Sequence, residues 1–464
     1  MRTRQVRAPS REESEGKAVR MKAANSLDAV FLSYASTPVE SMRLHPKKAR
    51  LRLLIYAMGC LSLAKPAFGQ QSSAPESKGQ LAQPEVEAQK PPVLGSVTPE
   101  KLPPFFADTE YRDWLQARRV DVYGWVEGGY TYSSAGSGLL ANAPTPNRFG
   151  NQFLFNAVWL IIERKPLTND WSWGFRSDFY AGSDAALLRP QNGFGPTDPR
   201  FGTDFRQLYL SLHMPALSEG GVDLLLGRQN VQIGYETLMA PYRPMYSETY
   251  FWIHYQVGST AATATWHATD QLDIMGSVIL GFNTFFSLRG SSPCYLAKAI
   301  YSLDPEKQTT VSAAVYTGPE PFPVATGHLG SWQTGAGAGV KHNWSRRLTQ
   351  EFLVYGSWDF NDPAVNRTSP AYGCFTILTY HLNQHLDLNG RGEWFYDRDG
   401  ARTGVAATFG EVTGGLNVMP NKWINFRPEI RGDFASKPAF GAFSSSNRER
   451  SELTVAFDVI LKFR

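Results

Sequence analysis

Charged side chains of both signs recur at every second position in two segments near the C-terminal end of the sequence. They are Arg391 and Glu393 in one segment, and Arg427, Glu429, Arg431 and Asp433 in the other. On a β-strand this spacing places each set on a single face. Mixed charges on the wall of a water-filled passage create a transverse field that sorts solutes by charge and dipole. We therefore take them as pore-lining candidates; the plainer interpretation is a hydrated wall whose charges pair with one another.

A stretch rich in aromatic and charged residues, 228–257, is the second candidate for a role in passage. We expect it to fold into the lumen of a barrel, where its aromatic rings and charges would either stack on sugar faces or pin the loop to the wall. Pro241 and Pro244 stiffen it in both cases. Its pore-lining candidates, with an earlier pair at the same two-residue spacing, are Arg228, Glu236, Arg243, Glu248, Arg176 and Asp178.

Catalytic and metal-binding motifs are not found in the sequence. The histidines are scattered, and none stands in a Gly-x-Ser-x-Gly or His-Glu-x-x-His setting. The three cysteines, Cys60, Cys294 and Cys374, lack the paired spacing of a zinc site. We predict no catalytic residue, no metal, no cofactor and no enzyme activity. Whether Cys294 and Cys374 form a disulfide stays open, because sequence separation does not report distance in space.

The elements that position these residues are strands, because apolar residues alternate with polar ones from about residue 120 to the end. The last segment shows this best: Leu453, Val455, Phe457, Val459, Leu461 and Phe463 alternate with mostly polar or small residues. The same alternation marks the segments around 171–179, 207–213, 351–359 and 424–434. One face of each strand therefore meets an apolar medium and the other face meets water.

The connections between the strands are of two kinds. Short turns such as 304–307 and 420–422 alternate with long stretches such as 134–151 and 183–203. This asymmetry is typical of up-and-down outer-membrane barrels, in which the short turns are periplasmic. We expect about sixteen strands, an even number that returns both termini to one side. A β-sandwich or propeller is the alternative, and the aromatic residues near strand ends together with the terminal aromatic strand argue against it.

Residues 42–69 have the character of an export signal, whereas the segment before Met42 does not. Basic residues precede the apolar run 53–64, and Ala67-Phe68-Gly69 offers a cleavage site. We expect translation to begin at Met42. Residues 70–104 are rich in Gln, Pro, Ser, Glu and Lys and predict a disordered periplasmic leader. A short helix over 108–119 follows, either a lead-in segment at the barrel mouth or a small plug.

Composition excludes two further classes. The net charge of +4 is small for 464 residues, and much of the basic excess precedes residue 53, so nucleic-acid binding gains no support. No apolar run reaches the ~18–20 residues that a transmembrane helix needs. The slightly negative mean hydropathy does not separate a membrane barrel from other β-proteins, because lipid-facing and lumen-facing residues average out in each strand.

The sequence resembles the Putative beta-barrel porin-2 (OmpL-like) family. The resemblance rests on ordered short segments: Tyr123 to Tyr132, Trp173 to Asp178, Gln207 to Leu212, Gly227 to Glu236, Tyr246 to Tyr250, and Phe426 to Arg431. It covers residues 120–464 and implies a bacterial outer-membrane porin without catalytic residues. In places Lys and Arg replace neutral polar residues of the family, which leaves the ion preference open.

Together these observations predict an all-β, transmembrane, antiparallel up-and-down β-barrel at 120–464, preceded by an extension and signal peptide at 1–69 and a leader at 70–119. We expect passive diffusion of small polar solutes or ions across the cell outer membrane. The alternative is a barrel that serves polysaccharide export or acts as a surface binding protein. The expected partners are outer-membrane lipid, the barrel-assembly machinery, small polar solutes and a second copy of the chain, but no nucleic acid.

Overall fold

The computed structural model describes residues 110–464, apart from 143–144, 191, 197, 232, 235, 256, 289 and 320–329. The expected signal peptide, the start at Met42 and the leader up to residue 109 lie outside the described residues. The helix expected over 108–119 is present as α3 (Glu110–Ala117). Tyr111 and Trp114 of this helix are 73% and 53% exposed, which fits a lead-in segment and not a plug.

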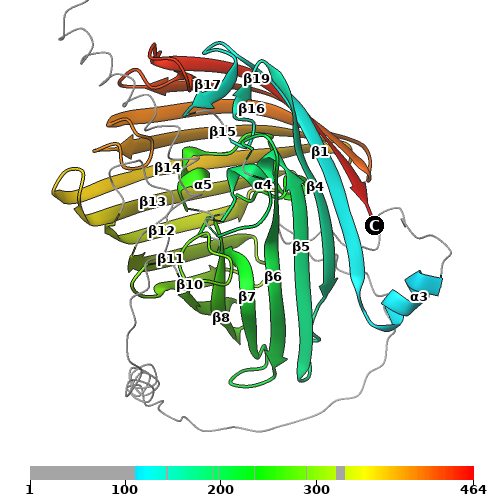
Figure 1. The fold of residues 1–464 in the computed structure, drawn as a ribbon. Helices are drawn as coiled ribbons and strands as arrows, with labels where there is room; N and C mark the ends of the chain where they lie inside the picture. The colour runs from blue at the N-terminus through cyan, green and yellow to red at the C-terminus, as the bar shows by residue number, and fades with distance from the viewer. Residues whose placement is uncertain are drawn as a thin grey trace, which may run out of the picture. The chain divides into compact units, whose positions relative to one another are not determined.

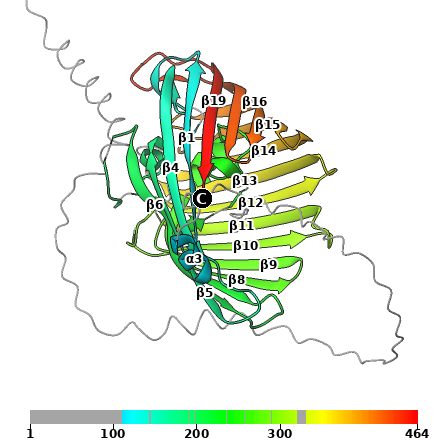
Figure 2. The ribbon, with the colours of Figure 1, turned by 90° about the vertical axis from the view of Figure 1, so that its right-hand side faces the viewer.

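Sixteen antiparallel strands form a closed barrel, which Figures 1 and 2 show from two sides. Each strand pairs with the strands that precede and follow it around the ring, so the topology is up-and-down. The predicted fold class and the strand count are confirmed. The strands are β1 (Asp121–Ser133), β4 (Gln152–Arg164), β5 (Ser172–Gly182), β6 (Gly202–Met214), β7 (Val222–Val231), β8 (Val257–Thr269), β9 (Leu272–Ile279), β10 (Cys294–Ser302), β11 (Thr309–Pro319), β12 (Trp332–Asn343), β13 (Leu348–Asp362), β14 (Arg367–Asn383), β15 (Leu386–Asp397), β16 (Ala407–Asn421), β17 (Ile424–Ala435) and β19 (Ser451–Phe463).

The barrel closes where its last strand pairs with its first. Gly124 of β1 lies opposite Phe463 of β19, and the pairing continues without a register shift to Ser133. Figure 2 shows the two strands side by side. One Nη atom of Arg464 donates to a carboxylate oxygen of Asp121 at 2.8 Å across the same seam. The predicted pairing of the terminal strand with the first strand is therefore confirmed.

The two faces of the strands differ as the alternation predicts. On β17, Ile430 and Phe434 are 54% and 52% exposed, whereas Arg431 and Asp433 between them are each 1% exposed. The exposed apolar side chains point away from the lumen and the charged ones point into it. An outward apolar face and an inward polar face are what a barrel wall in a membrane requires. The same division holds on β19, where exposed Val455 alternates with buried Asp458.

The two ends of the barrel carry connections of different length. At one end the turns are short, as in 270–271, 384–385 and 422–423. At the other end the loops contain structure of their own: β2 (Gly138–Ala141) and β3 (Phe149–Gly150), α4 (Ser183–Leu187), the 3-10 helix η3 (Ala240–Tyr242), α5 (Tyr250–Tyr255) and β18 (Gly441–Ala442). The short β2, β3 and β18 pair in a separate small sheet. The predicted alternation of short turns and long loops is confirmed.

None of the helices in the described part of the chain is long and apolar enough to cross a membrane. The two cysteines in that part, Cys294 on β10 and Cys374 on β14, do not form a disulfide with each other. Cys294 lies on the inward face beside Leu296, and Cys374 pairs with Val354 and Trp394 on the outward face. The question left open by the sequence is thus decided against that disulfide.

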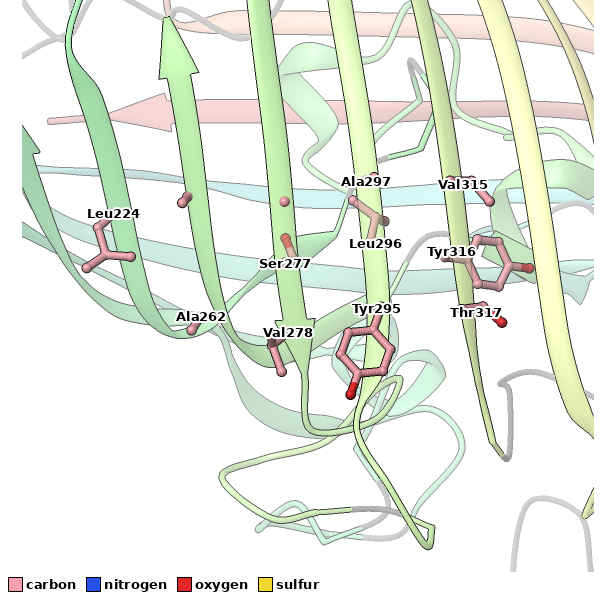
Figure 3. A pocket seen from close by; sticks show the side chains of 12 residues that line it. Leu224, Ala262, Ser277, Val278, Tyr295, Leu296, Ala297, Val315, Tyr316 and Thr317 are labelled. Carbon is pink, nitrogen blue, oxygen red and sulfur yellow. The ribbon is translucent and has the colours of Figure 1, made fainter. Parts of the chain in front are cut away.

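A shallow apolar groove runs across the outward face of strands β7 to β11 (Figure 3). Its floor consists of small residues, Ala262, Ala264, Gly276 and Ala297. The bulkier Leu224, Val278, Tyr295 and Val315 also line it. Because this face points away from the lumen, the groove is not part of the candidate passage.

Candidate functional site

The described residues of the connection between β7 and β8, 233–234 and 236–255, lie inside the ring of strands, as Figure 1 shows for α5. We call this segment the inward loop. Its hydrogen bonds reach side chains on the inner face of β1, β15 and β17. The expectation that the stretch 228–257 folds inward and faces Arg391, Arg427 and Arg431 is therefore confirmed, although its first residues belong to β7.

Two wall carboxylates bind main-chain N–H groups of the inward loop. Glu429 accepts hydrogen bonds from the N–H of Tyr246 at 2.9 Å and of Ser247 at 3.0 Å. Glu393 accepts from the N–H of Tyr250, the first residue of α5, at 2.6 Å and from the next N–H at 3.0 Å. A carboxyl group accepts through two oxygens, so one side chain can bind two neighbouring N–H groups. The wall thus fixes the loop at two points along its length.

Three wall arginines bind main-chain carbonyls of the same loop. Arg391 donates to Ser247 at 2.5 Å, Arg427 to Ala240 and Arg243 at 2.8 Å each, and Arg431 to Glu248 at 2.6 Å. The planar guanidinium group has several donors in a fixed geometry, so one arginine can bind a carbonyl and a carboxylate together. The alternating charges of the wall therefore match the alternating N–H and C=O groups of the loop.

Each of these arginines is also paired with a carboxylate. Arg391 is 2.7 Å from Glu411, Arg431 is 2.7 Å from Asp433, Arg427 pairs with Asp458, and Arg243 of the loop pairs with Glu127. Their side chains are at most 1% exposed. Under the plainer interpretation these charges are paired and hydrated. In the structure they are paired, but the inward loop covers them. Buried charges are tolerated here because the loop main chain and opposite charges supply their partners.

The loops also contain carboxyl groups whose ionisation is perturbed. Burial raises the pKa of Glu248 in the inward loop well above its usual value, and the neighbouring Glu236 adds to this, whereas Arg243 opposes it. Burial likewise raises the pKa of Asp184 in α4 to about 6, opposed by Arg243 and by a hydrogen bond from Asn156. The region between α4, the inward loop and β1 therefore contains carboxyls that take up protons more readily than exposed ones.

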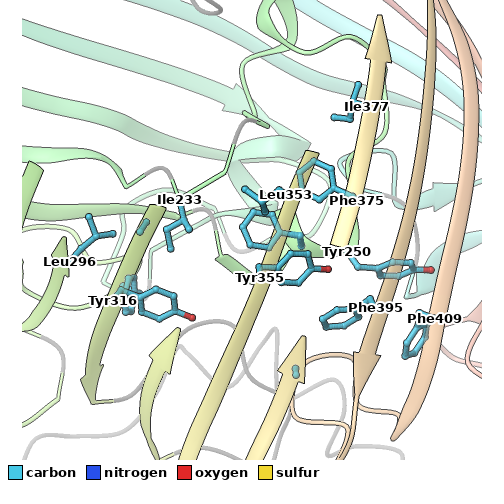
Figure 4. Close-up of a cluster of buried hydrophobic side chains, with 14 of the residues drawn as sticks. Ile233, Tyr250, Leu296, Tyr316, Leu353, Tyr355, Phe375, Ile377, Phe395 and Phe409 are labelled. Carbon is cyan, nitrogen blue, oxygen red and sulfur yellow. The ribbon is translucent and has the colours of Figure 1, made fainter. Parts of the chain in front are cut away.

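Aromatic rings of the inward loop pack against rings of the wall (Figure 4). Tyr250 stacks on Phe395 at 6.1 Å with an interplanar angle of 9°, and the Phe251 ring lies 4.2 Å from that of Tyr355. The hydroxyl of Tyr250 donates to Asp433 at 2.7 Å, and that of Tyr355 to Glu393 at 2.6 Å. These rings hold the loop to the wall, which was the plainer of the two interpretations of its aromatic residues.

A second group of aromatic rings, on β1, β4 and β5, supports α4 and the inward loop. Trp125 of β1 stacks on Trp159 of β4 at 5.0 Å, and Trp159 stacks on Tyr180 of β5 at 4.5 Å. Gly182, directly before α4, has a φ of 141°, and a Cβ there would lie 2.2 Å from the carbonyl oxygen of Asn156. Only glycine permits this close approach of α4 to β4.

The remaining predicted residues fall in other places. Arg176 and Asp178 form a pair at 2.7 Å on the inner face of β5, and Glu163 of β4 joins them at 3.1 Å. Glu236 lies within the inward loop and accepts the N–H of Thr249 at 3.1 Å. Arg228 is apart from the cluster.

Strand pairing places Arg228 opposite Leu208 of β6 and Thr260 of β8. It donates to Asp204 at 2.8 Å and to the carbonyl of Thr284 at 2.6 Å, and its side chain is fully buried. The structure therefore brings eleven of the twelve predicted residues to the inner wall or the inward loop and places Arg228 between the connections near the loop end. Their part in conduction stays a prediction.

Sequence reasoning missed three carboxylates, Glu127, Glu411 and Asp458, that complete the buried ion pairs. Each stands at an inward position of an alternating strand, so the alternation itself was a usable signal. It also missed a row of histidines and aspartates at the short-turn end, because the histidines were compared only with catalytic motifs. Among the described residues, no group of three or more His, Cys, Asp or Glu could hold a metal ion.

Comparison with known sequences gives one family. The profile described as Putative beta-barrel porin-2, OmpL-like, matches residues 119–463, which include all sixteen strands. A search of curated proteins finds no match to the sequence.

Comparison with solved structures gives porins at low identity. The anion-selective porin from Comamonas acidovorans is 10% identical and has a TM-score of 0.53, with 74% of this chain and 99% of that chain covered. The in-vitro folded OmpT of Vibrio cholerae, in its trimer form, is 9% identical and has a TM-score of 0.51, with 74% and 99% covered. The outer-membrane channel DcaP of Acinetobacter baumannii is 13% identical at a TM-score of 0.49, with 74% and 97% covered. At these identities the first two likenesses support the fold.

Proposed function

Because the chain belongs to the Putative beta-barrel porin-2 (OmpL-like) family, we propose that small polar solutes and ions pass through the part of its lumen that the inward loop leaves open. The protein is a porin of the cell outer membrane, a passive diffusion channel. The proposal adds the place of the constriction and the class of solute. It is supported by the polar inner face and by the attachment of the loop inside the barrel.

The observation that carries the proposal is the attachment of the inward loop to the wall by main-chain atoms. Glu393, Glu429, Arg391, Arg427 and Arg431 bind its N–H and C=O groups. A loop bound at so many points stays in the lumen and reduces the cross-section there. The loop then narrows the passage but, being fixed to the wall, does not move to close it. Diffusion of small solutes requires a passage that stays open.

The predicted pore-lining residues act in this proposal in two ways. Arg391, Glu393, Arg427, Glu429, Arg431, Asp433, Glu236, Arg243 and Glu248 set the position of the loop and contribute their field through it. Arg176 and Asp178 contribute a paired charge on the neighbouring wall. Arg228 stabilises the loop end of β6 to β8. No chemical step is proposed for any of them.

The experiment that tests the proposal is reconstitution of the purified full chain in a planar lipid bilayer. Discrete conductance steps that grow with salt concentration are expected, together with permeation of small neutral solutes into proteoliposomes in a swelling assay. Solutes above a size limit should be excluded. A barrel that inserts but conducts no ions would contradict a diffusion channel and would favour the alternative role in polysaccharide export or surface binding.

Export and assembly complete the proposal. A signal peptide ending near Gly69, a leader up to residue 119, recognition of the terminal strand by the barrel-assembly machinery and contact with outer-membrane lipid are the expected steps. A homo-oligomer is also proposed, since the OmpT structure to which the fold is similar is described as a trimer form. N-terminal sequencing of the membrane-inserted protein tests the cleavage, and a mature chain that begins at or before Met42 would contradict it.

A further inference from the structure

Histidines and aspartates alternate in a row across four neighbouring strands at the short-turn end of the barrel. His213 Nδ1 on β6 lies 2.7 Å from a carboxylate oxygen of Asp223 on β7. The other oxygen of Asp223 lies 3.2 Å from Nε2 of His267 on β8. His267 Nδ1 in turn lies 2.7 Å from a carboxylate oxygen of Asp273 on β9. We call these four residues the His–Asp row.

The His–Asp row lies on the inner face and is open to the lumen. The outward position next to Asp273 is Ile274, which is 41% exposed on the opposite face. The side chains of Asp223, His267 and Asp273 are 33%, 31% and 41% exposed. His213 alone is buried, at 1%. The ion-paired side chains of Arg391, Arg427 and Arg431 beneath the inward loop are at most 1% exposed, so the row is more accessible to the solution in the lumen than they are.

The residues that contact the row directly are uncharged, whereas the turns beside it carry Glu219 before β7 and Asp270 before β9. The strand residues paired directly with its two ends are Ser172 of β5, opposite His213, and Ile300 of β10, opposite Asp273. From the turn before β7, Ser218 donates to the carbonyl of His267, and Gly220 lies against its Cβ. These neighbours are uncharged. The next inward position along β10 is Lys298, which lies opposite Met275 and not opposite a member of the row.

The geometry at His267 depends on protonation. A neutral imidazole donates from one ring nitrogen only, whereas the protonated ring donates from both. Both nitrogens of His267 face carboxylate oxygens, so only the protonated ring can donate to Asp223 and Asp273 together. Histidine is the side chain that ordinarily changes charge between about pH 5 and 8. The charge that the row presents to the lumen therefore changes when this ring gains or loses its proton.

We propose that the His–Asp row is a proton-dependent cation-selective lining at the short-turn mouth of the channel. When His267 is neutral, the two carboxylates give the row a net negative charge and attract small inorganic and organic cations. When His267 is protonated, its positive charge offsets one of the two carboxylates and the attraction weakens. In outer-membrane barrels the short turns face the periplasm, so the row senses the pH of that side. This inference rests on the proposed conduction through the lumen.

The test is the reversal potential of the purified full chain in a bilayer under a KCl gradient, at pH 5.5 and at pH 8. The ratio of cation to anion permeability should rise about two- to threefold from the lower to the higher pH, at low salt where screening is weak. His267→Gln should remove most of this rise. Asp223→Asn combined with Asp273→Asn should lower the ratio at both pH values.

A matched control is His342→Gln. His342 of β12 pairs with Thr309 at 2.8 Å and contacts Trp344, away from the row. It should keep the full pH dependence of the parent protein. Should the His267→Gln protein fail to insert, the isosteric single variant Asp273→Asn replaces it and should lower cation preference at pH 8.

The outcomes distinguish failure of the proposed function from failure of this inference. Absence of conductance in the parent protein would overturn the proposed function. Conductance with the same reversal potential at both pH values would overturn this inference alone. Full retention of the pH dependence in His267→Gln would overturn it as well, since the proton would then act elsewhere.

Discussion

The inner wall of the barrel carries charges on two sides, and the two sides use them differently. On β15, β16, β17 and β19 the ion pairs of Arg391, Arg427 and Arg431 lie beneath the inward loop, with side chains at most 1% exposed. On β6 to β9 the charges of the His–Asp row are about one-third exposed or more, except for His213. The covered side holds a structural element in place, and the open side meets the solution. Residue type alone does not decide between these roles; what covers the residue does.

The largest effect is expected from shortening the inward loop itself. Deletion of residues 238–248 removes η3 and the main-chain groups bound by Arg427, Arg391 and Glu429. Single-channel conductance should roughly double, because the narrowest cross-section dominates the resistance. An unchanged conductance in correctly inserted protein would show that the loop does not limit the passage.

A smaller and more selective change is Glu429→Gln on the covered side. The amide keeps the shape but replaces an ionised acceptor of two main-chain N–H groups. Hydrogen bonds to charged groups contribute about 1.5–3 kcal/mol, so the temperature at which the folded band disappears on gels should fall. Glu306→Gln in an exposed short turn is the matched control. Equal behaviour of the two variants would speak against the attachment of the loop by Glu429.

The field of the covered side can be tested with Arg427→Ala combined with Arg431→Ala. The change removes positive charge and leaves Asp458 and Asp433 without their partners. The reversal potential should shift toward cation preference at low salt. The shift should shrink at 1 M salt, where the Debye length is ~3 Å. Lys422→Ala, a loss of positive charge in a short turn, should leave the potential in place. A potential that does not move in the double variant would exclude both arginines from influence on conduction.

Stability should depend on pH through Asp184 of α4. Its folded-state pKa is raised by burial from the usual 3.8 to about 6, so folding takes up a proton between these two values. The contribution of this group to stability is present below pH 3.8 and is lost as pH rises through 6, an effect of the order of 1–3 kcal/mol. Asp184→Asn should reduce the difference in thermal stability between pH 4.5 and 7.5. An undiminished difference would assign it to other groups.

The smallest effect is expected at an exposed pair far from the inward loop. Arg464 and Asp121 are 25% and 32% exposed, and pairs of this kind contribute about 0.2–1 kcal/mol. Asp121→Ala should therefore lower thermal stability slightly and leave conductance unchanged. A loss of thermal stability as large as that of Glu429→Gln would contradict the expectation that buried charges contribute more than exposed ones.

The sequence was sufficient for the fold and insufficient for the burial of the site. Two-residue alternation on β17 and β19 predicts which side chains face inward, and the strand count follows from the alternating short and long connections. Alternation does not report what lies in front of a wall. The inward loop that covers Arg427 and Arg431 lies some 180 residues earlier in the chain. No pattern in the neighbouring sequence indicates so distant a contact.

The same limit explains the residues that were missed or misplaced. Arg228 stands on an alternating strand, yet it is enclosed by Asp204 and by the connection that contains Thr284. The His–Asp row follows from hairpin geometry: His213 and Asp223, like His267 and Asp273, stand opposite or nearly opposite each other across short turns. The contact between Asp223 on β7 and His267 on β8 depends on how neighbouring hairpins are aligned. The sequence alone does not reveal that alignment.

The way in which the wall binds the inward loop has a consequence for how such a channel can change over generations. Most of the attachment uses peptide N–H and C=O groups, which every residue except proline supplies in full. Side chains of the loop that make no bond to the wall can then be exchanged while the frame stays intact. Substitutions at those positions, in evolution or by design, can change the chemistry of the narrow passage while the sixteen strands stay unchanged.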